Sequence, residues 1–83
     1  MSRLNRVAVV GLGYIGLPTA AVFADHGIDV LGIDINQAAV ESINQGRPHI
    51  SEPELDVLLR KVVQDGKLRA SLSPEPADAF ILA

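Results

Sequence analysis

No cysteine and no tryptophan occur in the 83 residues of this sequence, and its aromatic residues are one tyrosine and two phenylalanines. The lack of cysteine excludes a disulfide framework and every thiolate-bound metal site. The two histidines, His26 and His49, have no metal-ligand spacing between them. Seven Lys and Arg stand against ten Asp and Glu, for a formal net charge of −3. That balance, with no basic stripe, argues against nucleic acid as a partner.

Long uninterrupted hydrophobic segments are lacking as well. The one candidate is the uncharged run from Val7 to Ala24, which follows Arg3 and Arg6 and resembles a signal peptide or a short membrane span. Glycines and Pro18 interrupt this run, and its periodicity changes from that of a buried strand to that of a helix. We therefore expect neither a membrane segment nor secretion, and we predict a cytoplasmic protein.

Aliphatic residues are what the sequence has in quantity, since 48% of it is hydrophobic although only 4% is aromatic. This composition is typical of parallel strands packed against helices, and the length allows one small domain. Apolar runs predict four strands, over residues 6–10, 29–34, 68–72 and 79–83.

Three helices are predicted between these strands. The first spans residues 14–26 and ends at Gly27, and the second follows an Asn36 N-cap and ends at Gly46. Ser51 and Glu54 fit a capping box at the start of the third helix, with Ser51 as N-cap.

Alternating strands and helices predict an α/β fold. The expected architecture is a partial Rossmann-type doubly wound parallel sheet, with strand order 3-2-1-4 and helices on both faces. Because the last apolar run stops without a following helix, residues 1–83 are interpreted as the N-terminal part of a dinucleotide-binding domain. Such a fragment would expose an apolar strand edge, which predicts weak stability or self-association in isolation.

Three glycines at the end of the first predicted strand carry the clearest functional signal. Gly11, Gly13 and Gly16 fit the pattern G-x-G-x-x-G. The first glycine permits a sharp turn, the second allows a pyrophosphate to approach the backbone, and the third lets the helix pack closely on the strand. The backbone N–H groups of Tyr14 and Ile15, at the predicted helix start, are expected to face the phosphates.

Asp34 completes this pattern. It ends the second predicted strand, close to the offset of roughly 20 residues at which dinucleotide-binding proteins carry a ribose-binding acid. Its carboxylate would accept hydrogen bonds from both ribose hydroxyls and repel a 2′-phosphate, so the sequence predicts NAD rather than NADP. A glycine turn in a protein that binds no nucleotide is the alternative.

With these motifs in place, the sequence resembles the N-terminal end of the UDP-glucose/GDP-mannose dehydrogenase family. The resemblance rests on GLGYIGLP at Gly11–Pro18, GIDIN at Gly32–Asn36 and HISEPEL at His49–Leu55. Within the family, the run from Ile43 to Leu55 is most similar to the members that act on UDP-N-acetyl-D-mannosamine.

The resemblance implies an NAD-dependent enzyme, usually a homo-oligomer, that oxidises the C6 alcohol of a UDP-sugar to a carboxylate with two NAD. Such enzymes hold the aldehyde on a cysteine, assisted by a lysine. This chain has no cysteine, so no catalytic residue is assigned in it, and it is predicted to be inactive alone. The cofactor-binding residues carried over are Gly11, Gly13, Tyr14, Ile15, Gly16 and Asp34.

Other functions remain open at this point. A UDP-glucose dehydrogenase is one, and a hydroxyacid dehydrogenase is another, although the Ser51–Leu55 segment disfavours the latter. A non-catalytic nucleotide-binding module is the third.

Overall fold

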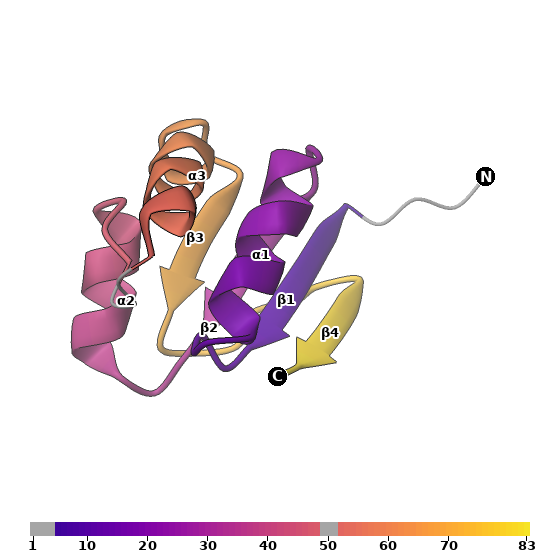
Figure 1. Ribbon diagram of the computed structural model, residues 1–83. Coiled ribbons are helices and arrows are strands. Elements are labelled where there is room, and N and C mark those ends of the chain that lie inside the picture. The colour runs from indigo at the N-terminus through magenta and orange to yellow at the C-terminus, as the bar shows by residue number, and fades with distance from the viewer. Residues whose placement is uncertain (1–4, 49–51) are drawn as a thin grey trace.

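A computed structural model describes residues 5–48 and 52–83, and its centre is a four-stranded parallel sheet (Figure 1). The strands are β1 (Arg6–Val10), β2 (Asp29–Ile33), β3 (Leu68–Ser71) and β4 (Ala79–Leu82). Their order is β3-β2-β1-β4, with Val7 in register with Val30 on one side and with Ala79 on the other. The predicted strand order is therefore confirmed.

The helices α1 (Gly16–Asp25), α2 (Gln37–Asn44) and α3 (Pro53–Gln64) all pack on one face of this sheet (Figure 1). Apolar residues of all three helices share one buried cluster with the β-strands: Val7, Val9, Leu12, Leu17, Ala20, Ala21, Ala24, Val30, Val40, Ile43, Leu55, Leu59, Val62, Leu68 and Ala70. The expectation of helices on both faces is thus not met by the described residues. The chain steps from β1 to β2 to β3 in one direction, and right-handed crossovers in one direction place every helix on the same side.

The second face of the sheet is crossed by the connection from β3 to β4, residues 72–78. Ala77 in this connection packs against a second buried cluster, formed by Ala8, Leu31 and Ile33. Glu75 accepts hydrogen bonds of 3.1 and 2.7 Å from the Arg69 guanidinium, which hold the pKa of the Glu75 carboxyl below its usual value. A short connection with two prolines therefore takes the place of a helix here.

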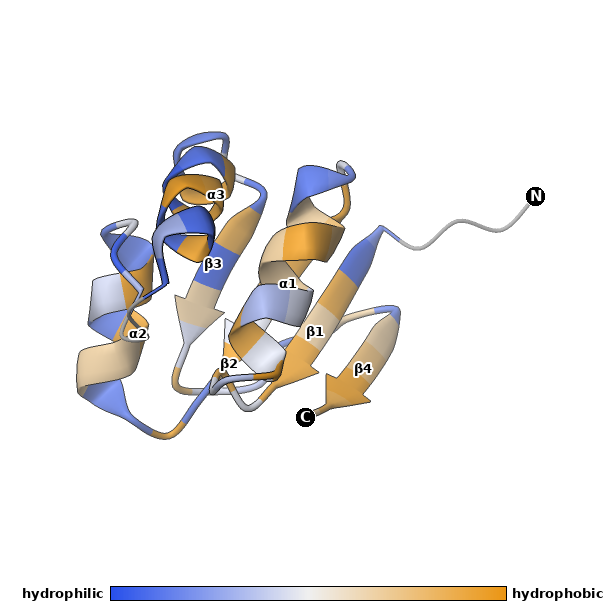
Figure 2. Ribbon diagram, viewed as in Figure 1, coloured by the Kyte–Doolittle hydropathy of each residue, from blue (hydrophilic) through white to orange (hydrophobic). Residues whose placement is uncertain are grey.

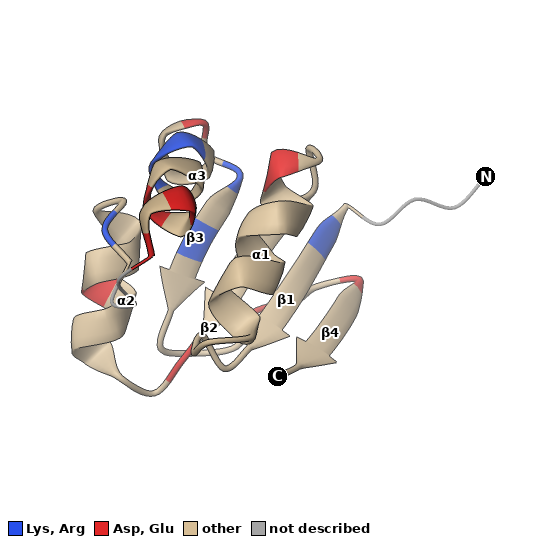
Figure 3. Cartoon of the chain, in the orientation of Figure 1, with Lys and Arg blue, Asp and Glu red and all other residues tan. Residues whose placement is uncertain are grey.

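Strand β4 is apolar along its length (Figure 2) but only partly covered. Phe80 and Leu82 pair with Ala8 and Val10 of β1 and are 51% and 80% exposed. Charged residues of both signs lie mostly on α3 and at the ends of the other elements (Figure 3).

Element boundaries differ from the predicted ones by one or two residues, mostly at caps. Helix α1 begins at Gly16 with Ile15 as its N-cap, so Tyr14 and Ile15 precede the helix. The Asn36 N-cap is confirmed, because its side chain accepts from the Ala39 N–H at 3.1 Å. Glycines in the left-handed region, at positions 27, 46 and 66, follow the three helices as predicted.

The predicted capping box at the start of α3, with Ser51 as N-cap, is wrong. Glu52 is the N-cap, and its carboxylate accepts from the backbone N–H groups of Glu54 at 3.1 Å and Leu55 at 2.7 Å. Pro53 has no N–H and suits the first helical position, which moves the cap to the residue before it. Ser51 lies outside the described residues.

Across residues 5–48 and 52–83, no helix is long and apolar enough to cross a membrane.

Asn44, at the end of α2, closes the outer edge of β3. Its side-chain amide donates to the Ala70 carbonyl at 2.9 Å, and its carbonyl accepts from the Ala70 N–H at 2.8 Å. Asn44→Ala is expected to destabilise the protein by roughly 1–3 kcal/mol, because it leaves two partly buried backbone groups without partners. Urea unfolding measures this, and Gln37→Ala on the same helix, an exposed amide, is the control that should stay within about 0.5 kcal/mol. Equal stability of the two variants would contradict an edge-closing role for Asn44.

Candidate functional site

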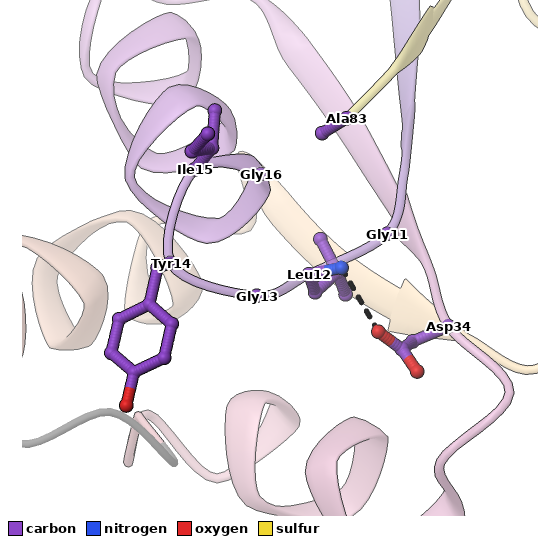
Figure 4. Close-up of a pocket in the computed structure, with 8 residues that line it drawn as sticks. All are labelled: Gly11, Leu12, Gly13, Tyr14, Ile15, Gly16, Asp34 and Ala83. Carbon is purple, nitrogen blue, oxygen red and sulfur yellow. Dashed lines mark hydrogen bonds between the residues drawn. The ribbon is translucent and has the colours of Figure 1, made fainter.

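The predicted site residues lie together at the carboxyl end of the sheet, where β1 turns into α1 (Figure 4). They surround a hollow of about 290 Å³. Its lining contains all six predicted residues and two others: Gly11, Leu12, Gly13, Tyr14, Ile15, Gly16, Asp34 and Ala83. Carboxyl ends of parallel strands are where α/β folds bind ligands.

The three glycines have three different surroundings. Gly11 has φ +94°, a conformation that side chains rarely adopt, and it begins the turn. A Cβ on Gly16 would lie 1.6 Å from the Gly11 carbonyl oxygen, so the first residue of α1 lies too close to the backbone of the turn to carry a side chain. A Cβ on Gly13 would meet nothing within 4 Å, so the backbone there faces open space. These surroundings are those that the G-x-G-x-x-G pattern predicts.

The turn presents backbone donors at the N-terminus of α1. Within the described part of the chain, no protein acceptor takes the N–H groups of Gly13, Tyr14 and Ile15. Ile15 gives no side-chain cap, and its side chain and that of Tyr14 are 74% and 84% exposed. Unpaired donors and the positive end of the helix dipole together favour an anion at this position.

Asp34 follows β2 directly and brings a carboxylate to the same turn. Its Oδ2 accepts from the Leu12 N–H at 2.9 Å (Figure 4), and its Oδ1 accepts from the Asn36 N–H at 2.9 Å. These bonds fix the orientation of the carboxylate beside the N–H groups of the turn. A carboxylate accepts up to about four hydrogen bonds, which suits a neighbouring pair of hydroxyl groups.

A second hollow of about 160 Å³ adjoins the first and shares Gly11 and Asp34 with it. Its remaining lining is apolar, from Val10, Ile33 and Ile35. Ile35 is 95% exposed, which is unusual for a large aliphatic side chain. An apolar wall beside a carboxylate is suited to a flat, weakly polar ring.

The arrangement therefore provides for binding an anion, a diol and a ring. No group of three or more His, Cys, Asp or Glu side chains that could hold a metal occurs in the described ranges.

A family model described as the UDP-glucose/GDP-mannose dehydrogenase family, NAD binding domain, matches residues 5–83. The chain belongs to this family. The family resemblance and the NAD prediction are thereby confirmed, and the hydroxyacid dehydrogenase interpretation is not favoured.

Similar members of the UDP-glucose/GDP-mannose dehydrogenase family carry two kinds of name. UDP-N-acetyl-D-mannosamine dehydrogenase of Campylobacter jejuni is 59% identical over 83 residues, which are 100% of this chain and 20% of that protein. NDP-N-acetyl-D-galactosaminuronic acid dehydrogenase of Ralstonia nicotianae is 62% identical over 77 residues, 93% of this chain and 18% of that protein.

Solved structures of the family have the same fold. The UDP-N-acetyl-mannosamine dehydrogenase of Staphylococcus aureus is similar with a TM-score of 0.91 at 50% identity, covering 94% of this chain and 19% of that chain. The chain thus spans about one fifth of the length of these relatives.

Two residues of this NAD-binding domain were not singled out from the sequence. Leu12 gives the site its bond to Asp34, and its side chain is fully buried. Gly32, the fourth residue of β2, lies against that side chain. A large apolar residue between two turn glycines and a glycine inside an apolar strand were the available signals.

Proposed function

We propose that this chain is the cofactor-binding end of an NAD-dependent UDP-sugar 6-dehydrogenase. The complete enzyme would oxidise the C6 alcohol of UDP-N-acetyl-D-mannosamine to a carboxylate with two NAD. The names of the relatives at 59% and 50% identity support this substrate. NAD, when bound, supplies the hydride acceptor for each oxidation step.

The observation that carries the proposal is the position of the Asp34 carboxylate, 2.9 Å from the N–H of Leu12 in the glycine turn. A ligand that binds both the Asp34 carboxylate and the N–H groups of the turn needs a diol and an anion close together. The adenosine diphosphate half of NAD has both. Gly13, Tyr14 and Ile15 would hold the pyrophosphate by their N–H groups. Gly11 and Gly16 shape the turn, and Asp34 would hold the ribose.

The same carboxylate supports NAD over NADP. A 2′-phosphate would bring about two negative charges against Asp34. No basic residue that could pair with a 2′-phosphate follows Asp34 directly in the sequence, at Ile35, Asn36 or Gln37.

This chain by itself is proposed to be inactive. It contains no cysteine to hold an aldehyde intermediate, and the site described above has donors for a cofactor but no nucleophile. The catalytic and sugar-binding residues would lie in the larger part of the protein, since the relatives are about five times longer than this chain.

The test is a substrate panel on the complete protein. We expect NADH formation with UDP-N-acetyl-D-mannosamine, two NADH per sugar, and a much higher Kd for NADP than for NAD in calorimetry. UDP-N-acetyl-D-galactosamine and UDP-glucose are the comparison sugars, the first because a relative with a galactosaminuronic acid name is 62% identical. NAD binding without turnover of any sugar would favour a non-catalytic nucleotide-binding module.

Assembly and location belong to the same proposal. We infer a homo-oligomer, as the family resemblance implies, and a cytoplasmic enzyme, which the lack of a membrane-spanning helix in the described residues allows. Light scattering of the complete protein and cell fractionation test these two points.

A further inference from the structure

The side chain of Leu12 occupies the space that a side chain at position 32 would need. A Cβ added to Gly32 would lie 2.8 Å from both Cδ atoms of Leu12 and 3.3 Å from its Cγ. Leu12 is 0% exposed and belongs to the buried cluster between the sheet and the helices. The buried Leu12 side chain of the glycine turn therefore packs directly on β2.

Two hydrogen bonds tie the same turn to the same strand end. The Gly11 N–H donates to the Ile33 carbonyl at 2.8 Å, which extends the pairing of β1 with β2 by one residue. The Leu12 N–H donates to Asp34 Oδ2 at 2.9 Å. The packing of the Leu12 side chain on Gly32 is the third contact between the turn and β2, in addition to these two hydrogen bonds.

We propose that the Leu12–Gly32 contact is a positioning device that sets the spacing between the N–H donors of the turn and the Asp34 carboxylate. Leu12 and Gly32 touch no ligand in this role; they act through Gly13 and Asp34. The inference rests on the proposed binding of NAD by this site. It explains why a glycine stands among the buried apolar residues of β2, in register with Val9 of β1 and Ala70 of β3.

A positioning role differs from simple core packing in what it predicts for ligands of different length. A shift of the turn relative to Asp34 penalises a ligand that must reach both groups, such as ADP. Adenosine reaches only the carboxylate side and should be affected little. A loss of packing that only destabilised the domain would lower the affinity for ADP and for adenosine by the same factor.

The experiment measures Kd for ADP and for adenosine by calorimetry on the complete protein. Gly32→Ala overpacks the contact by one methyl group, and we expect its Kd for ADP to rise about tenfold or more, with less than about a threefold change for adenosine. Leu12→Val together with Gly32→Ala conserves the number of side-chain carbons, and its ADP affinity should return to within about threefold of the unchanged protein. Val30→Ile adds one methylene on the same face of β2, away from the turn, and should leave the Kd for ADP and the Kd for adenosine unchanged.

Each result decides the inference. Unchanged ADP affinity in Gly32→Ala, or equal losses for ADP and adenosine, would overturn it. If Gly32→Ala does not fold, the double variant decides: tight ADP binding supports the device, whereas weak ADP binding or failure to fold overturns it. Absence of ADP and NAD binding by the unchanged protein would instead overturn the proposed function, and this inference with it.

Discussion

Gly16→Ala is expected to destabilise the protein by about 3 kcal/mol or more, and to abolish NAD binding with it. The added Cβ would lie 1.6 Å from the carbonyl oxygen of Gly11, far inside van der Waals contact, and this oxygen belongs to the backbone, which no rotamer change can move. Either α1 must move away from the turn, which opens the buried cluster around Leu17 and Ala20, or the turn itself must unfold. Thermal and urea unfolding of the complete protein measure the loss.

Gly13→Ala is the matched control for this prediction. Its Cβ would meet nothing within 4 Å, and its φ is not in the left-handed region, so unfolding should change by less than about 1 kcal/mol. NAD affinity should nevertheless fall, because the methyl group would occupy the space through which a pyrophosphate approaches the backbone. A Gly16→Ala variant as stable as Gly13→Ala would show that α1 does not depend on backbone contact with the turn.

Asp34→Asn is expected to weaken NAD binding by roughly 10- to 100-fold, the range for hydrogen bonds to a charged group. The amide keeps the size of the side chain but replaces one oxygen acceptor with a donor. That donor would face either the Leu12 N–H or the Asn36 N–H, each now 2.9 Å from a carboxylate oxygen. NADP should lose less affinity than NAD, because removing the negative charge also removes its repulsion of the 2′-phosphate. Calorimetry with both dinucleotides gives the ratio of the two Kd values.

Asp34→Arg should change the ratio of the Kd values for NAD and NADP further, because it should weaken NAD binding and strengthen NADP binding. Asp29→Asn is the control, since it alters the same residue type at the opposite end of β2, where Asp29 lies 3.6 Å from Lys67 in an exposed ion pair. Exposed pairs contribute little, so NAD affinity and selectivity should stay unchanged in this variant. An NAD-to-NADP ratio that is the same in Asp34→Asn, Asp34→Arg and the unchanged protein would remove Asp34 from the ribose-binding role.

Much of the helical packing could be predicted because the signal is local. Leu17, Ala20, Ala21 and Ala24 recur at helical spacing, and all four are buried in α1. Helical spacing also relates the buried residues Leu55, Leu59 and Val62 of α3. A buried face depends on which residues share one side of a helix, and residue spacing determines that directly.

Helix caps were less predictable, because several residues near the start of a helix can accept hydrogen bonds from its first backbone N–H groups. Ser51 and Glu52 both precede α3 and both carry oxygen acceptors. The backbone at Pro53 decides between them, because Glu52 lies one residue before the first helical position and reaches two N–H groups at once. Sequence pattern alone ranks Ser first as an N-cap and so favoured the wrong residue.

The sequence by itself determined the presence of a glycine turn and of an acid at a strand end, because both follow from residue type and spacing, and it predicted the strand order through the usual order of the doubly wound fold class. Only the tertiary structure decided that all three helices of the described chain share one face, that the Asp34 carboxylate lies 2.9 Å from the turn, and that Leu12 is seated on Gly32. These contacts join segments about 20 residues apart in the chain. They form only when hydrogen bonds set β1 and β2 in register, and spacing along the chain does not specify where side chains meet across that register.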